Sequence, residues 1–204
     1  RQMRMNLRNP AWVIIGMLQP VLYLLLFGPL LEPVIAQLGP GVNQYTWFVP
    51  GMLVQLGIFG AFFAGFSLIG EWREGVIEAE RVTPASRTAL LVGRLGRDLA
   101  QLFVQAVILV VLGTALGMDA SVAGVVVGVA LTLLLGGACA AASNALALTT
   151  KSEDVMAPVI NVVMMPVLLL SGILLPMTFG AAWLDRLADL MPIRHVVDAV
   201  RGAF

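Results

Sequence analysis

The residues best suited to chemistry in this sequence are gathered in one charged stretch, residues 71–97. The stretch holds five arginines and four glutamates, and it lies between two strongly apolar runs. A charged side chain at the centre of a bilayer costs about 2.5–3.5 kcal/mol, so this many charges cannot lie in hydrocarbon together. The stretch must therefore lie in water beside a membrane, where its charges can bind another protein.

The spacing of the first charges predicts a short helix. Glu71, Glu74, Glu78 and Arg81 follow one another at steps of three and four residues, which places them along one helical face. Trp72 lies on another face. We therefore expect a charged helix with an acidic face.

A proline then predicts a hinge. Thr83 is a good N-cap, and Pro84 suits the first helical position because the N–H that proline lacks would have no partner there. From Ala85 the pattern can continue as one helix into the next apolar segment. The stretch thus predicts a charged helix, a hinge and a second helix that returns to the membrane.

Two interpretations of these charges stay open. Membrane topology and anionic lipid explain the later arginines, Arg87, Arg94 and Arg97. They do not explain an acidic helical face beside a tryptophan, for which we favour docking to a partner. The predicted docking residues are Glu71, Trp72, Arg73, Glu74, Gly75, Glu78, Arg81, Thr83 and Pro84.

The composition is that of an integral membrane protein. Of the 204 residues, 59% are hydrophobic and 12% are charged, whereas a soluble domain has about 25% charged residues. The mean hydropathy is +0.94. The formal net charge is zero, which gives no basic field for nucleic acid. The single Cys139 cannot form an internal disulfide.

Five apolar segments predict an all-α polytopic membrane protein, because each is near the roughly 20 residues that cross a bilayer. The predicted spans are residues 10–31, 46–70, 98–117, 122–149 and 155–175. Residues 1–9 are expected to lie in the headgroup layer. Small residues such as Gly57 and Gly65 give the second span faces for close helix contact.

The basic residues orient these spans. With the N-terminus in the cytoplasm, nine of the twelve basic residues lie inside, and the positive-inside rule favours this assignment. The inside residues are Arg1, Arg4, Arg8, Arg73, Arg81, Arg87, Arg94, Arg97 and Lys151. The charged stretch is therefore predicted to be cytoplasmic.

The tail, residues 176–204, predicts two short amphipathic helices separated at Pro192. Neither can span the membrane, so we expect them to dip into the outer leaflet and return. Pairing would lower the cost of placing their charges near lipid, and the expected pairs are Arg186 with Asp189, Arg194 with Asp198, and Asp198 with Arg201. The residues assigned to this outer structure are Trp183, Pro192, Arg194, Asp198 and Arg201.

Uncharged polar residues within the spans are candidates for a substrate path. The amides among these are Gln19, Gln55, Gln101, Gln105, Asn144 and Asn161, and the candidates selected from them are Gln19, Gln55, Asn144 and Asn161. Such groups more often make hydrogen bonds between helices than bind ligands. No charged residue lies deep in a span, which argues against an ion-coupled carrier. The pattern predicts no metal site, and the lone His195 is expected at a surface or interface.

The charged stretch EWREGVIEAERVTPASR resembles the cytoplasmic signature of type 2 ABC (ABC-2) exporter permeases, in which a Glu-x-Gly in a Glu/Arg-rich run leads to Thr-Pro and then Arg. The tail LPMTFGAAWLDRLADLMPIRHVVDAVRGAF is similar to the segment after the fifth span of that family, and Arg8-Asn9-Pro10 also fits. The branch that it most resembles is the bacterial drug-resistance exporters related to daunorubicin permeases.

The resemblance implies six spans, with the sixth beyond Phe204, a coupling helix between spans two and three, and outer re-entrant helices after span five. It also implies a bacterial cell membrane and a pair of permeases, identical or paralogous, bound to two ATPase subunits that hold ATP and Mg²⁺. One departure is Met191, which stands where an asparagine often precedes the tail proline.

This chain is expected to bind no cofactor itself. Its single lysine, Lys151, follows Thr149-Thr150, so no GxxxxGK[ST] phosphate loop exists. The resulting hypothesis is a permease that exports a drug-like or amphiphilic compound. The alternatives are a permease for a lipid-linked glycan or other envelope component, and an intramembrane enzyme. The spans contain no Ser/His, paired Asp or HExxH constellation for an enzyme.

Overall fold

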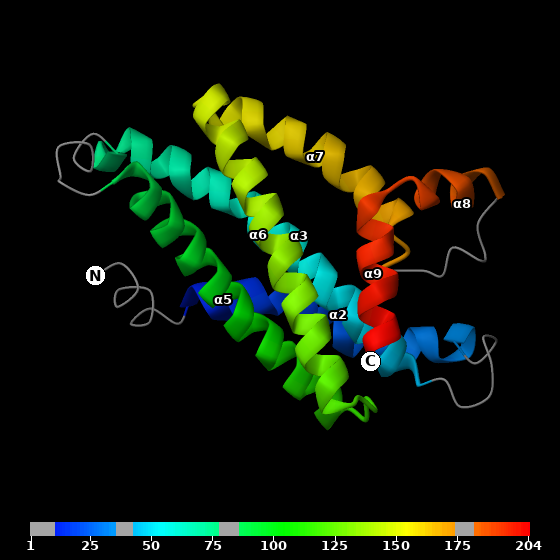
Figure 1. Cartoon of the computed structure of the whole chain (residues 1–204). Helices are drawn as coiled ribbons and strands as arrows, with labels where there is room; N and C mark the ends of the chain where they lie inside the picture. The colour runs from blue at the N-terminus through cyan, green and yellow to red at the C-terminus, as the bar shows by residue number, and fades with distance from the viewer. Residues whose placement is uncertain (1–10, 36–42, 78–85, 174–181) are drawn as a thin grey trace.

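The structure, a computed structural model, describes residues 11–35, 43–77, 86–173 and 182–204. These residues form helices joined by short turns (Figure 1). The helices are α2 (Ala11–Ile35), α3 (Gln44–Arg73), α5 (Arg87–Ala115), α6 (Val122–Thr150), α7 (Glu153–Leu170), α8 (Ala182–Asp189) and α9 (Pro192–Ala203). The prediction of an all-α polytopic membrane protein is confirmed.

Four of the described helices are long and apolar enough to cross a membrane, namely α3, α5, α6 and α7. They contain most of the predicted second to fifth spans. The predicted first span, residues 10–31, corresponds to α2, whose apolar segment Met17–Leu30 is shorter than the other four. Three prolines, Pro20, Pro29 and Pro33, lie inside α2.

Helix α3 is the centre of the bundle. It packs against α2, α5, α6, α7 and α9, and 67% of its most apolar segment is buried, against 33% or less in the other three spans. Figure 1 shows α6 crossing α3, with α5 beside α6. Any displacement of α3 must therefore disturb most of the other helices.

Small residues let α3 and α6 approach closely, as the sequence predicted. A Cβ atom added at Gly65 would lie 2.7 Å from the carbonyl oxygen of Ser143, and one at Gly57 would lie 3.2 Å from the carbonyl oxygen of Thr132. The Ser143 hydroxyl donates a hydrogen bond of 2.9 Å to the Phe62 carbonyl oxygen. Backbone contact and a polar bond together fix this crossing.

The first residues of α3 are tied to the turn between α5 and α6. The Asn43 side chain caps α3 by accepting from the Tyr45 N–H, and its amide nitrogen donates to the Gly117 carbonyl oxygen at 2.6 Å. The Thr46 hydroxyl accepts from the Asp119 N–H at 3.1 Å. These bonds hold the first residues of α3 in place, at the end of the helix opposite to the charged stretch.

The fifth span ends earlier than the predicted boundary, residues 155–175. Helix α7 stops at Leu170, with Ser171 as its C-cap. Gly172 then adopts a φ of 69°, which a residue with a side chain rarely accepts. The glycine turns the chain out of the helix before the expected end, so the prediction for this boundary was wrong.

Replacing Gly65 by alanine should destabilise the bundle by about 1–3 kcal/mol, because the added methyl group meets the α6 backbone, which cannot move like a side chain. Thermal unfolding in detergent measures the effect. Gly60→Ala is the matched control, since a Cβ there meets nothing within 4 Å. Equal Tm values for the two variants would contradict the close α3–α6 contact.

Candidate functional site

The carboxylate of Glu71 ties α3 to α5. One oxygen, Oε2, lies 2.9 Å from Nη2 of Arg94, and the other, Oε1, lies 3.1 Å from Nη1 of Arg97. The three side chains are only 14–17% exposed. The Arg97 contact is a hydrogen bond, whereas the Arg94 contact is a close ion pair in which Oε2 of Glu71 accepts no hydrogen bond from the described residues. The carboxylate therefore lies between two guanidinium groups of α5, away from bulk water.

Arg97 extends the network. Its Nη2 donates to the Ser67 hydroxyl at 3.3 Å, which is a second link to α3. Its Nε donates to Oδ1 of the neighbouring Asp98 at 3.2 Å. The guanidinium group is therefore engaged at all three nitrogens.

Two further contacts join the end of α3 to the turn between α6 and α7. The Lys151 ammonium lies 4.1 Å from the centroid of the Trp72 ring, a cation–π contact. Nη1 of Arg73 lies 3.2 Å from Oε1 of Glu153, in an ion pair that is about half exposed. Exposed pairs of this kind contribute little stability, so the Glu71 network is the stronger tie.

The predicted charged helix is corrected by these contacts. Glu71, Trp72 and Arg73 form the last turn of the membrane helix α3 rather than the start of a separate helix. Glu74 is the C-cap, and Gly75 has a φ of 72°, which ends the helix because glycine tolerates this conformation. Glu71 faces α5 and not the same free surface as Glu74, which is exposed.

The rest of the predicted docking set, Glu78, Arg81, Thr83 and Pro84, lies outside the described residues, and its docking role stays a prediction. Helix α5 begins at Arg87, with the Ser86 hydroxyl accepting from the Ala89 N–H at 3.2 Å. The start expected at Ala85 was therefore early, because Ser86 is extended and acts as the N-cap.

Arg194 joins the two short helices α8 and α9. Its Nη1 lies 2.7 Å from Oδ1 of Asp185 and 3.1 Å from Oδ1 of Asp189, and its Nε lies 3.8 Å from Oδ2 of Asp198. Burial lowers the pKa of the Arg194 guanidinium, but the three carboxylates raise it by more. The expected pair with Asp198 is present, whereas Asp189 pairs with Arg194 rather than with Arg186, because α8 and α9 fold against each other.

Arg201 lies inside the junction of α9, α3 and the end of α7. Its guanidinium carbon is 3.8 Å from the centroid of the Trp47 ring, and it donates to the carbonyl oxygens of Gly172 at 2.8 Å and Trp47 at 3.3 Å. Burial lowers the pKa of Arg201 to about 10, against the opposing charge of Asp198, so the group stays protonated at neutral pH. Backbone carbonyls and a ring thus replace the expected ion pair with Asp198.

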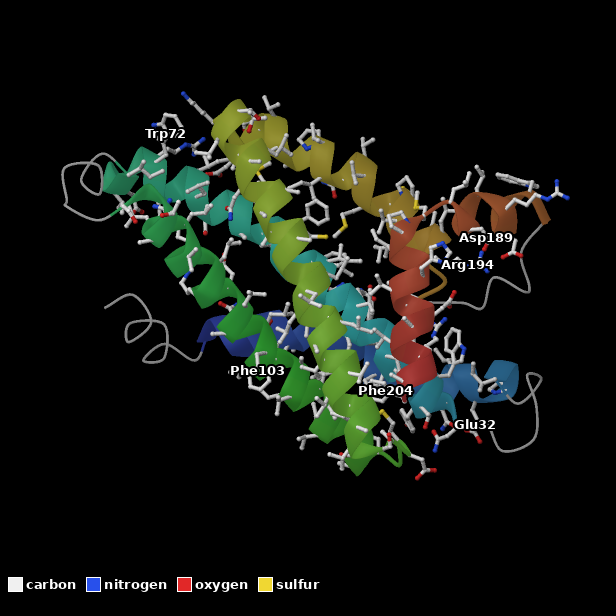
Figure 2. The ribbon with its side chains drawn as sticks, in the orientation of Figure 1. Glu32, Trp72, Phe103, Asp189, Arg194 and Phe204 are labelled. Atoms are coloured by element: carbon white, nitrogen blue, oxygen red, sulfur yellow. The ribbon has the colours of Figure 1, made fainter. Side chains whose placement is uncertain are left out.

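The two predicted functional regions lie far apart. Figure 2 shows Trp72 at one end of the helix bundle, and Arg194 with Asp189 near the other. Trp183, also assigned to the outer structure, is 63% exposed. Pro192 opens α9 at its first helical position, as expected. The charged contacts thus lie at the two ends of the long helices and not in their middle.

The sequence profile of the ABC-2 type transporter family matches residues 1–204. The chain belongs to this family. The suspected resemblance to ABC-2 permeases is therefore confirmed over the whole chain.

Curated relatives of this ABC-2 protein include ycf38 transport permeases of Cyanophora paradoxa, at 28% identity, and Porphyra purpurea, at 26%. Another relative, at 26% identity, is the daunorubicin resistance ABC transporter permease protein DrrB1 of Streptomyces coeruleorubidus. These alignments cover 94–95% of this chain and 68% of each relative. No solved structure matches significantly.

The predicted substrate-path residues of this ABC-2 protein are not brought together. Gln55 and Asn144 are buried, at 5% and 4% exposure, and Oε1 of Gln55 has no hydrogen-bond partner among the described residues. Gln19 is exposed on α2. Asn161 lines a cavity between α3 and α7. Their role in a substrate path stays a prediction.

Sequence reasoning missed the partners of Glu71. It assigned Arg94 and Arg97 to topology alone, although their spacing of three residues places them on one face of α5. That spacing could have indicated a paired site, but not which carboxylate it receives. The contact of Arg201 with Trp47 joins residues 154 positions apart and left no local signal.

Glu71→Gln should destabilise the chain by about 1–3 kcal/mol, because two poorly exposed guanidinium groups lose their shared carboxylate. Thermal unfolding gives the change. Glu74→Gln removes an exposed carboxylate nearby and serves as the control. If both variants unfold at the same temperature, Glu71 does not tie α3 to α5.

Arg201→Met should loosen α9 by about 2 kcal/mol through the loss of its carbonyl bonds and ring contact. Hydrogen–deuterium exchange of the α9 amides should rise, while exchange in α6 stays unchanged. Arg186→Met removes an exposed arginine of α8 for comparison. Unchanged protection of α9 would show that Arg201 does not anchor it.

Proposed function

We propose that this chain is the transmembrane subunit of an ATP-driven exporter, with ATP and Mg²⁺ bound on separate ATPase subunits. Membership of the ABC-2 transporter family supports this proposal, as do the relatives named as transport permeases. The sequence contains no phosphate-binding loop that would place ATP on this chain. Two ATPase subunits and a second permease, identical or paralogous, complete the proposed complex.

The observation that carries the proposal is the end of α3. Glu74 is exposed where Gly75 ends the helix, and the side chains just before it are held by α5, α6 and α7. An exposed acidic residue at a rigidly held helix end suits docking to a basic groove of a partner. We place the docking surface at Glu74 and the following residues, including Glu78 and Arg81.

Glu71 gives this surface a route into the membrane. When the ATPase subunits close on ATP, a pull on the chain after Glu74 acts on α3 directly and on α5 through the Glu71 network. Since α3 also contacts α2, α6, α7 and α9, its displacement can open a path outward. The chain thus converts a pull at one end into helix movement and catalyses no reaction of its own.

We propose a drug-like or amphiphilic cargo, which accords with the drug-resistance permease among the relatives. The alternative is a lipid-linked glycan or other envelope component. The observation that favours it is the cavity between α3 and α7 that Asn161 lines. This cavity has a volume of about 520 Å³, and its phenylalanines suit a lipid tail. A neighbouring gene for a glycan enzyme would support the alternative.

The spanning helices make this a multi-pass membrane protein. We propose that it lies in a bacterial cell membrane with its N-terminus in the cytoplasm, since this orientation places nine of twelve basic residues inside. The end of α3 that carries Trp72 would then face the cytoplasm, and α8 and α9 would face outward. This is the arrangement that ATPase docking requires.

Charge reversal at the docking surface tests the proposal. Glu74→Lys with Glu78→Lys should reduce copurification of the ATPase and its stimulated hydrolysis at least about tenfold, because two attractive charges become repulsive. Glu32→Lys with Asp119→Lys reverses two exposed acidic residues at the opposite end of the bundle for comparison. Unchanged copurification and hydrolysis in the Glu74/Glu78 variant would refute docking at this surface.

A further inference from the structure

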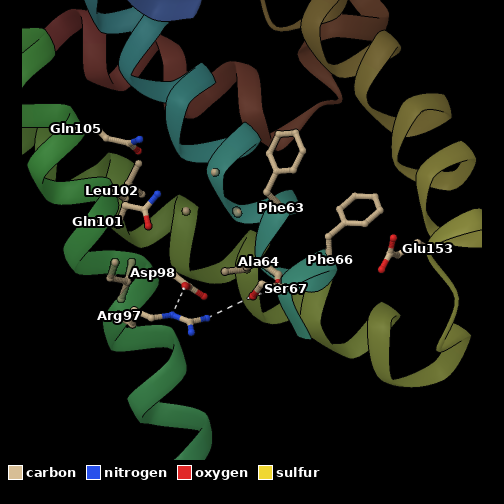
Figure 3. A pocket seen from close by; sticks show the side chains of 15 residues that line it. Phe63, Ala64, Phe66, Ser67, Arg97, Asp98, Gln101, Leu102, Gln105 and Glu153 are labelled. Carbon is tan, nitrogen blue, oxygen red and sulfur yellow. Dashed lines mark hydrogen bonds and ion pairs between the residues drawn. The ribbon is translucent and has the colours of Figure 1, made fainter. Parts of the chain in front are cut away.

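A cavity of about 490 Å³ lies between α3, α5 and α6, next to the Glu71 network. Figure 3 shows Arg97, Asp98 and Gln101 on one side and Phe63 and Phe66 on the other. Phe63 lines the cavity and is 64% exposed, so the cavity opens at the surface of the chain. Two of the amide residues within the spans, Gln101 and Gln105, line it, whereas Gln19, Gln55, Asn144 and Asn161 do not.

The polar wall of the cavity has free hydrogen-bonding groups. Asp98, Gln101 and Gln105 follow at steps of three and four residues, which aligns them on one face of α5. Gln105 is 4% exposed, and neither glutamine has a hydrogen-bond partner within the described part of the chain. Both amides line the cavity, so a ligand there can reach them.

The free groups favour a ligand that donates hydrogen bonds. Arg97 is already bound at each nitrogen, to Glu71, Ser67 and Asp98. Asp98, whose side chain is 21% exposed, uses only Oδ1 in that contact, so Oδ2 can accept from another donor. A ligand therefore meets a free carboxylate oxygen and two amides, but a guanidinium group that is largely occupied.

The opposite wall, on α3, is aromatic: Phe63 and Phe66 lie there, across the cavity from Asp98 and Gln101. Leu99 and Leu102 add apolar surface on the α5 side. Aromatic rings bind flat apolar bodies and also attract cations over their faces. The cavity thus combines a polar end, which holds a free carboxylate oxygen, with an aromatic wall.

We propose that this cavity binds an amphiphile with a protonated amine at one end and an aromatic or aliphatic body at the other. The amine donates to Oδ2 of Asp98 and to the Gln101 and Gln105 amides, and the body lies against Phe63 and Phe66. The physiological meaning of this site rests on the proposed export function. If the ligand is cargo, it lies beside the ion pairs that join α3 to α5.

Binding of 1-pyrenemethylamine to the full chain in lipid nanodiscs, followed by fluorescence anisotropy without ATP or ATPase, tests the site. The amine is protonated at neutral pH, and its N-acetyl derivative has the same ring system without the charge. The amine should bind about tenfold more tightly than the acetylated probe. Equal affinities would overturn the assignment of a cationic ligand.

Two variants locate the binding. Asp98→Asn should weaken amine binding about tenfold and leave the acetylated probe unaffected, because it removes the charge and keeps the shape. Gln105→Leu leaves the Glu71 network intact and should weaken binding of the amine about fivefold. Asp154→Asn, at an exposed residue at the start of α7, is the matched control.

The outcomes separate this site from the proposed function. If Gln105→Leu and Asp98→Asn bind the amine as tightly as the parent chain, the cavity is not its site. The assay needs no ATPase, so loss of docking in the Glu74/Glu78 variant would leave these affinities unchanged. Conversely, intact docking with no difference between the two probes would refute the site alone.

Discussion

The fold depends on one carboxylate placed at the edge of the membrane. Glu71 lies at the end of the most buried helix, and both of its oxygens are bound to arginines of α5. Charges that cannot enter hydrocarbon must be paired or hydrated, and pairing here also joins two spanning helices. The same contact therefore satisfies the bilayer and fixes how α3 and α5 lie together.

The outer end uses arginine differently. Arg201 binds backbone carbonyls and the Trp47 ring instead of a carboxylate, so α9 is held against the beginning of α3 and the turn after α7. Helix α3 is thus anchored at both ends, and Gly65 and Ser143 bring its backbone against α6 in between. These contacts suit the role that we propose for α3 in coupling to an ATPase. The cavity beside Arg97 lies between these tied helices.

Sequence alone predicted the helical class, most of the spans and the two amphipathic outer helices, because hydropathy and helical period are local properties. It failed where a long-range partner decided the structure. Glu71 was assigned to a free acidic face, but its arginines lie more than 20 positions away. The end of α7 was misplaced because the left-handed turn at Gly172 overrides an apolar run, and the cavity needed three helices to be placed before Gln105 could be seen to line it.

The central claim is that the Glu71 network makes α3 and α5 one rigid unit at the end that carries Trp72. Spin labels on cysteines at Gly70 and Gly93, where an added Cβ atom meets nothing within 4 Å, report the separation of the two helices. The complexes contain one labelled copy, in which the free Cys139 is replaced by serine. The account predicts the same narrow distance distribution before and after ATP binds to the ATPase partner. A distribution that shifts or broadens by several ångströms on ATP binding would show that the helices move independently and would contradict it.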